Sequence, residues 1–494
     1  MAAIRERAFV PVLLFVGAVV SIVSSLGAPL IPDLARNLHT TLGSAQWALT
    51  ATVLVAAVAS PVVGRLGDGP HRKRVVMAGL GAVVVGCALA AMAGSLAVLI
   101  AGRALQGLGL ALMPLTMAAA REHLAPDRSV RAIAAISVVG VIGVGLGYPI
   151  TGLIADHLDV SAAYWFGSAV SLAALVMAVL VIPEPADRPA KRHLDLLGAT
   201  ISGFGLIALL VALEKGPDWG WATVRTPALF LLGLLLLGVW TRHELRTEEP
   251  LVELRLVRHP AVLTANVTGF MLGVTMYLLM VLITQFVQLP GFGLGETVFV
   301  AGLTLVPLSA FSAVSSRLMP RVEDLVGARM IIPLGSLAVA ASAVLFAVAV
   351  EQLWQLFLVT ALLGVGFGFT FAAMPGLIVG AIPRGETGSA MGFYQVSRFV
   401  GFSVGSGVAV TLLRAFGESG EPTLAAYHST AMAAAGIGVV SALVAWYLPG
   451  RAVPVDHGLD DLAIEEGSLG SVGLETIEED LPARHPAAVG PATR

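Results

Sequence analysis

Residues 64–74 read Gly64-Arg65-Leu66-Gly67-Asp68-Gly69-Pro70-His71-Arg72-Lys73-Arg74 and form a dense polar island between two long apolar runs. The flanking runs, 46–63 and 75–94, are each long enough to cross a bilayer as a helix. The island is therefore predicted to be a short loop at a membrane surface. Its surplus of basic residues over one acid predicts the cytoplasmic side, because positive charge concentrates in cytoplasmic loops.

The composition is that of a polytopic membrane protein. Of the 494 residues, 57% are hydrophobic and 12% are charged, whereas soluble domains usually carry about 25% charged residues. The net charge of −3, with basic residues scattered over loops, argues against a nucleic-acid binder. The single cysteine, Cys87, excludes an internal disulfide and a cysteine-based metal site. The abundance of Arg, Ala and Gly is typical of a GC-rich bacterial genome.

The apolar runs predict about fourteen spanning helices of roughly 20 residues each. Basic residues of alternate loops fall on the same side as the island, which predicts an even number of spans with both termini in the cytoplasm. We therefore expect a multi-pass protein of the bacterial inner membrane.

The order of the loops predicts a duplicated, all-α architecture. We expect two pseudo-symmetric six-helix bundles with an inserted two-helix hairpin. The predicted boundaries are 1–187 for the N-terminal bundle, 188–241 for the hairpin, 242–450 for the C-terminal bundle and 451–494 for a cytoplasmic tail. The acidic, polar composition of that tail predicts disorder.

Two arginines lie well inside apolar runs. A cation in a membrane-spanning helix costs at least about 2.5–3.5 kcal/mol, so Arg103 and Arg398 are expected to face a cavity or a partner. Gln106 follows Arg103 by one helical turn on the same face. Tyr394 and Gln395 precede Arg398 and are expected to lie near the same cavity.

Other polar residues within the spans are candidates for the cavity wall or for a hinge. Asn266, Tyr277 and Gln285 share one span and either line the cavity or form hydrogen bonds between helices. In the fifth span, Gly and Pro permit a bend and a close helix approach. These hinge candidates are Gly145, Gly147, Pro149 and Gly152.

Acidic residues that could carry a proton are few. Asp33 and Asp156, near the outer ends of the first and fifth spans, are the better candidates. Glu122, Glu214 and Glu296 are further candidates, with Glu214 placed at the end of the seventh span. As an alternative, each of the five acids lies at the membrane interface or caps a helix.

Six motifs, in order, resemble the major facilitator superfamily and its fourteen-span drug:proton antiporter branch. The island resembles the signature loop after the second span. Two more resemble the span-four and span-five motifs: Arg103-Ala-Leu-Gln106-Gly107-Leu-Gly109 and Gly145-x-Gly147-Tyr148-Pro149-x-x-Gly152. Three resemble the fourteen-span branch itself: Gln46-Trp47-x-x-Thr50, Gly216-Pro217-x-Trp219-Gly220-Trp221 and Pro250-Leu251-Val252-Glu253-Leu254-Arg255.

The resemblance implies roles for these residues. Gly64, Asp68, Arg72 and Arg74 would form a gating loop, in which Asp68 latches one end shut in one conformational state. Arg103 would tune a nearby carboxylate or water chain during proton exchange, the alternative being a structural arginine that bonds carbonyl groups. Gln46, Trp47 and Thr50 would belong to the substrate cavity. The acid often found in the first span of this branch is absent, which argues against a cation-specific site.

We therefore expect a secondary active exporter of small amphipathic molecules, driven by proton exchange. It would need no cofactor or metal, only the proton gradient, and would act as a monomer in the lipid bilayer, because the two halves make a complete pathway. Two alternatives stay open. One is an uptake or facilitative transporter with the same fold. The other is a lipid-modifying membrane enzyme, for which the widely scattered histidines offer no clustered site.

Overall fold

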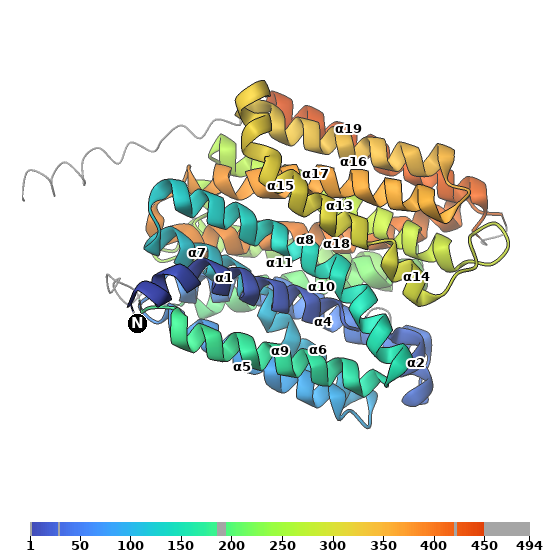
Figure 1. Cartoon of the computed structure of the whole chain (residues 1–494), viewed down its shortest axis with the longest axis horizontal. Coiled ribbons are helices and arrows are strands. Elements are labelled where there is room, and N and C mark those ends of the chain that lie inside the picture. The colour runs from blue at the N-terminus through green and yellow to red at the C-terminus, as the bar shows by residue number, and fades with distance from the viewer. Residues whose placement is uncertain (1, 28–29, 185–193, 419–421, 449–494) are drawn as a thin grey trace, which may run out of the picture. The chain divides into compact units, whose positions relative to one another are not determined.

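The computed structural model describes residues 2–27, 30–184, 194–418 and 422–448. These residues form helices joined by short connections and contain no β-strand (Figure 1). Fourteen of the helical segments are long and apolar enough to cross a membrane. The predicted all-α membrane fold is therefore confirmed.

The bounds of the helices follow the predicted spans. The first half contains α1 (Ala2–Ser25), α2 (Ile31–Asn37), α3 (Leu42–Ala45), α4 (Trp47–Gly67), α5 (Arg72–Ala91), α6 (Leu96–Leu110), α7 (Met113–His123), α8 (Pro126–His157) and α9 (Val160–Val181). The hairpin consists of α10 (Leu196–Trp219) and α11 (Arg225–Glu244). The second half contains α12 (Leu254–Val257), α13 (Pro260–Gln288), α14 (Val298–Leu303), α15 (Val306–Val326), α16 (Ala328–Ala349), α17 (Leu353–Val379), η1 (Arg384–Glu386), α18 (Thr387–Phe416) and α19 (Leu424–Tyr447).

Short polar side chains begin several of these helices. Ser95, Asp159, Asp195, Thr297 and Thr423 each precede a helix and accept a hydrogen bond from a backbone N–H of its first turn. The first N–H groups of a helix have no partner within it, and such caps satisfy them. The caps therefore define where α6, α9, α10, α14 and α19 begin.

The two halves repeat one packing scheme. In the first half, α1 packs on α8 and α9, α4 packs on α6, and α5 packs on α6 and α9. In the second half, α13 packs on α18 and α19, α15 packs on α17, and α16 packs on α17 and α19. Counted by span, each pair in one half has its counterpart in the other. Figure 1 shows α5 and α9 at the bottom and their counterparts, α16 and α19, at the top.

The inserted hairpin touches both halves. Helices α10 and α11 pack along each other, and α10 also contacts α4 of the first half and α18 of the second. Close approach of the pair is possible because Gly233 of α11 faces the backbone of Leu209, where a Cβ would lie 2.7 Å from the amide nitrogen. The exact boundaries of the bundles and the hairpin stay predictions. The tail, 451–494, lies outside the described residues.

The halves meet directly through α4 against α18 and through α8 against α15 and α17. Two glycines permit the first of these contacts. A Cβ on Gly388 of α18 would lie 2.5 Å from the carbonyl oxygen of Gly64 on α4, and a Cβ on Gly392 would lie 2.6 Å from that of Ser60. Because these obstacles are backbone atoms, neither helix can yield by rotating a side chain.

We predict that Gly64→Ala opens the contact between α4 and α18. The added Cβ would collide with the carbonyl of Gly388, and overpacking of this kind costs about 1–3 kcal/mol. The opening can be measured by electron–electron double resonance between spin labels at the exposed His71 and Leu325, with Cys87→Ser to remove the native thiol. The label distance should lengthen in Gly64→Ala.

Gly81→Ala is the matched control, because no heavy atom lies within 4 Å of a Cβ at Gly81. This variant should keep the wild-type distance distribution. An unchanged distribution in Gly64→Ala would contradict the proposed steric constraint.

Candidate functional site

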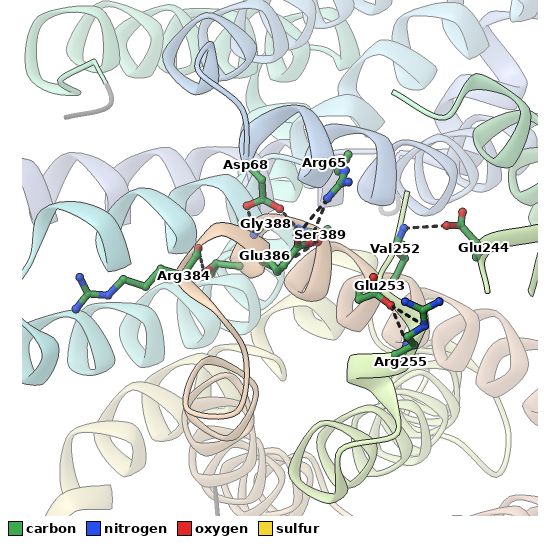
Figure 2. Close-up of polar contacts among 11 residues, drawn as sticks. Arg65, Asp68, Glu244, Val252, Glu253, Arg255, Arg384, Glu386, Gly388 and Ser389 are labelled. Carbon is green, nitrogen blue, oxygen red and sulfur yellow. Dashed lines mark hydrogen bonds and ion pairs between the residues drawn. The ribbon is translucent and has the colours of Figure 1, made fainter. Parts of the chain in front are cut away.

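Asp68 of the first half binds the N-terminus of α18 in the second. Its two carboxylate oxygens accept hydrogen bonds from the backbone N–H groups of Gly388, at 2.7 Å, and Ser389, at 2.8 Å. Figure 2 shows the carboxylate directed at the first turn of that helix. A helix N-terminus carries unpaired N–H groups and a partial positive charge, so it favours an anion. Asp68 therefore caps a helix that lies more than 300 residues later in the chain.

Further polar contacts surround Asp68. Arg65 donates to Glu386 with an N–O distance of 3.2 Å (Figure 2). Arg121 of α7 holds the segment that joins α17 to α18. Its guanidinium donates to the carbonyl oxygens of Val379, Ile382 and Pro383 and to the hydroxyl of Thr387, over 2.6–3.2 Å. The sequence analysis did not single out Arg121, whose partners come from the other half.

The residues expected to form the gating loop differ in their placement. Asp68 and Gly64 lie in the contact itself. Arg72 is buried beside it, donates to the carbonyl oxygen of Gly67 and pairs with Glu122. Arg74 is exposed and takes part in none of these contacts. The structure therefore assigns Arg72 to holding the loop against α7 and leaves Arg74 outside the contact.

The environment of Asp68 shifts its titration. Burial raises the pKa of its carboxyl from 3.8 to about 6, while the N–H bonds from Ser389 and Gly388 lower it in part. The negative charge of Glu386 adds to the increase. The hydrogen bonds thus offset only part of the cost of removing the carboxylate from water.

Arg103 caps the end of α1 inside the membrane-spanning region. The guanidinium is fully buried and donates to the carbonyl oxygens of Val23 (3.2 Å) and Ser24 (2.8 Å), which belong to the last turn of α1. It also donates to the carbonyl of Ala48 and to the side-chain oxygen of Gln106. The last carbonyls of a helix lack intrahelical partners and carry partial negative charge, so a cation stabilises them.

Arg103 forms no ion pair with a carboxylate among the described residues. Of the two interpretations of this arginine, its observed contacts match the structural one, in which it bonds carbonyl groups. Gln106 lies on the same face of α6, as the spacing predicts.

A central cavity of about 260 Å³ lies between the two halves. The first half contributes Ser24, Ser25, Leu49, Thr50, Thr52, Val53, Leu54, Arg103, Leu110, Val144 and Tyr148. The second half contributes Tyr277, Val281, Phe399, Phe402, Ser403 and Ser406. The hairpin helix α10 contributes Leu210 and Glu214. The wall is thus mainly apolar and aromatic, with a few hydroxyl groups and two charged side chains.

Family comparison identifies the fold. Residues 13–348 and 318–461 match the Major Facilitator Superfamily. The chain belongs to the Major Facilitator Superfamily. It is a multi-pass membrane transporter of that superfamily, as the sequence motifs indicated.

Several relatives within the superfamily cover most of the chain. The tetracenomycin C resistance and export protein of Streptomyces glaucescens is 27% identical over 80% of this chain and 73% of its own. The multidrug resistance protein Stp of Mycobacterium tuberculosis is 26% identical over 78% of this chain and 72% of its own. The human organic anion transporter MFSD10 (TETRAN) shares the fold with a TM-score of 0.62 at 16% identity, covering 89% of this chain and 99% of that structure.

Of the residues expected to line the substrate cavity of this transporter, Thr50 and Tyr277 do so. The other six expected residues do not line this cavity. Gln46 is exposed, and the ring of Trp47 packs under Lys215. Asn266 accepts a hydrogen bond from Ser397, and Gln285 accepts one from Tyr427. Tyr394 donates a hydrogen bond to Met374, and Gln395 accepts one from Arg398. Asn266 lines a separate apolar groove beside α10 and α11.

Arg398 lies in an aromatic enclosure. Its guanidinium carbon is 4.1 Å from the ring centre of Phe371 and 5.7 Å from those of Tyr394 and Phe402. The side chain donates to the Gln395 oxygen at 2.9 Å. Aromatic faces attract cations, most strongly where water is excluded. Rings and an amide, and no described carboxylate, therefore stabilise this buried charge.

The hinge candidates of α8 lie at close helix contacts. Gly145 faces the carbonyl oxygen of Leu305, the residue that precedes α15, and a Cβ there would lie 2.7 Å from that oxygen. Gly147 faces α1 at Ile22 and Ser25, and Gly152 has only ordinary contact with Phe299. Helix α8 runs from Pro126 to His157 without interruption at Pro149. Gly145 and Gly147 therefore permit close approach, and hinge motion stays a prediction.

The acidic candidates also separate by position. Asp33 pairs with the exposed Arg36 on α2 and lies outside the cavity. The side chain of Asp156 lies outside the described residues. Glu122 pairs with Arg72, and Glu214 lines the central cavity. The sequence predicts Glu214 at the end of the seventh span, but α10 continues to Trp219, which places Glu214 inside the helix.

We predict that the contact between α4 and α18 depends on pH through Asp68. Its pKa is about 6 in the contact and is ordinary, near 3.8, when the helices separate and expose it. The contact thus binds the proton more tightly than the open form does. As the pH falls from about 6 towards 3.8, the contact should be increasingly favoured, whereas above about 6 the carboxylate is ionised in both forms and the pH dependence ends.

The label pair at His71 and Leu325 can test this by comparing distances at pH 8 and pH 5. The shorter distance should gain population at pH 5, and Asp68→Asn, which cannot titrate, should abolish the difference. A pH response that persists in Asp68→Asn would assign it to another group.

We predict that Arg103→Lys destabilises the protein although it keeps the charge. An ammonium group offers three donors from one point and cannot match four acceptors on three helices. Buried acceptors left without a partner cost about 1–3 kcal/mol, so the midpoint of thermal unfolding in detergent should fall. Arg128→Lys, at an exposed position, should leave it unchanged. Equal midpoints for both variants would refute the capping role.

Proposed function

We propose that the protein exports small amphipathic molecules in exchange for protons by alternating access. The observation that carries this proposal is the central cavity, to which both halves and the hairpin contribute, together with the contact that joins the halves at the Asp68 end. A cavity between two similar bundles suits a mechanism in which one bundle rocks against the other around a fixed site.

The contact of Asp68 would act as a latch in this cycle. Closing it requires desolvation of a carboxylate, and opening it leaves two N–H groups at the start of α18 without their acceptor. These two contributions favour opposite conformations, and alternating access needs both conformations to be populated. The pH dependence of Asp68 would then link the latch to the proton concentration.

The side chains of the cavity wall support the proposed cargo, and the names of two relatives support the proposed direction of transport. Aromatic and aliphatic side chains with few polar groups suit amphipathic molecules. Two of the relatives carry export or multidrug resistance in their names. We place the protein in a bacterial inner membrane, with both termini and the Asp68 end in the cytoplasm. It would work as a monomer, with the proton gradient as energy source and no cofactor.

The proposal can be tested by fluorescent-drug transport into inverted vesicles under an imposed pH gradient. Wild type is compared with Asp68→Asn and Arg103→Ala at equal expression. Gradient-driven transport should fall at least tenfold in both variants, because one loses the latch and the other the cap of α1. Glu351→Gln removes an exposed carboxylate between α16 and α17 and should transport like wild type.

Other outcomes would decide against the proposal. Transport that ignores the gradient would favour facilitated diffusion. Transport only in the opposite direction would favour uptake. The absence of transport for a broad panel of drugs in wild type would refute drug export.

A further inference from the structure

The inserted hairpin places a carboxylate in the central cavity. Glu214 of α10 lines the cavity wall opposite residues of both halves. The sequence analysis argued against a cation-specific site because the first span lacks an acid. The structure supplies an acid from the seventh span instead.

Glu214 has no basic partner at ion-pair distance among the described residues. The neighbouring Lys215 is directed elsewhere: its ammonium lies 3.7 Å from Asp218 and 5.1 Å from the ring centre of Trp47. From α4, Thr50 faces the carboxylate as a neutral hydrogen-bonding group. The charge of Glu214 therefore has no fixed counter-ion.

Aromatic rings complete the surroundings of Glu214. Tyr277 and Phe402 stack with ring centres 4.5 Å apart, and Tyr148 and Phe399 belong to the same wall. Ring faces carry partial negative charge and attract organic cations. The Glu214 carboxylate and the faces of the aromatic rings therefore both favour a positively charged, partly apolar ligand.

Arg103 is the cationic side chain of this wall, and four of its five N–H donors are already engaged. Four hydrogen bonds tie its guanidinium to the carbonyls of α1 and α4 and to Gln106. An anionic ligand would find a single free N–H on this guanidinium and would also meet Glu214. The arrangement thus disfavours anions.

We propose that Glu214 is the recognition group for monovalent organic cations, whose apolar part the aromatic rings of the cavity receive. A carboxylate in a membrane-spanning segment is costly without a counter-charge, and a bound ammonium group supplies one. This inference rests on the proposed export function, whose cargo it narrows.

The test uses the full-length protein in lipid nanodiscs and two probes. Ethidium is a permanently charged aromatic cation, and chloramphenicol is neutral. Glu214→Gln should weaken ethidium binding at least tenfold and change chloramphenicol binding less than twofold. Glu214→Asp keeps the charge and should retain most of the ethidium affinity. The control Glu351→Gln should match wild type for both probes.

A second measurement on wild type does not depend on a variant that folds. Ethidium should protect Glu214 from modification by dicyclohexylcarbodiimide, detected by mass spectrometry, whereas chloramphenicol should not. Unchanged ethidium affinity in Glu214→Gln, or no protection of Glu214, would overturn the cation site.

The two proposals can fail separately. Gradient-driven export of chloramphenicol by a wild type that does not bind ethidium would overturn the cation site and keep the export function. Ethidium binding that depends on Glu214, without gradient-driven transport of any probe, would support the cation site and overturn the export function.

Discussion

The N-terminus of α18 needs an acceptor for its first N–H groups, and Asp68 of the opposite half provides it. This contact is the constraint on which the arrangement of the two halves depends. It holds only where the backbones of α4 and α18 touch, and Gly64 and Gly388 make that approach possible. Arg65 and Arg121 add bonds to the same segment. One carboxylate, two glycines and two arginines thus form one of the contacts between the halves, and α8 forms another with α15 and α17.

The two buried arginines of the spanning helices are stabilised by groups other than carboxylates. Neither Arg103 nor Arg398 pairs with a described carboxylate, although each lies in a spanning segment. Arg103 satisfies the carbonyls at the end of α1, and Arg398 lies among aromatic rings. Each arginine also bonds a glutamine one helical turn away. Backbone dipoles and ring faces therefore replace counter-ions, and neither arginine pairs with Glu214 of the cavity wall.

The inserted two-helix hairpin is part of the cavity that lies between the two six-helix bundles. An insert between two complete bundles could lie at their edge and leave the cavity to the bundles alone. Here α10 contacts both α4 and α18 and carries Glu214 into the wall between them. The hairpin thus contributes a carboxylate to the cavity wall, and neither half contributes one there among the described residues. Substrate selection in this transporter would then depend on the segment outside the internal repeat.

The spans, their order and the importance of Asp68 and Arg103 could be predicted from the sequence. Hydropathy and charge are properties of each residue, and an apolar run must become a helix in a membrane because its backbone has no other partners. Which side chains meet could be seen only once the helices were packed together. Asn266 and Gln285 turn to neighbouring helices, and Glu214 enters the cavity, because helix rotation and packing direct each face. Contacts such as that of Asp68 with α18 join residues far apart in the chain, and a local sequence pattern does not predict which distant residue will be the partner.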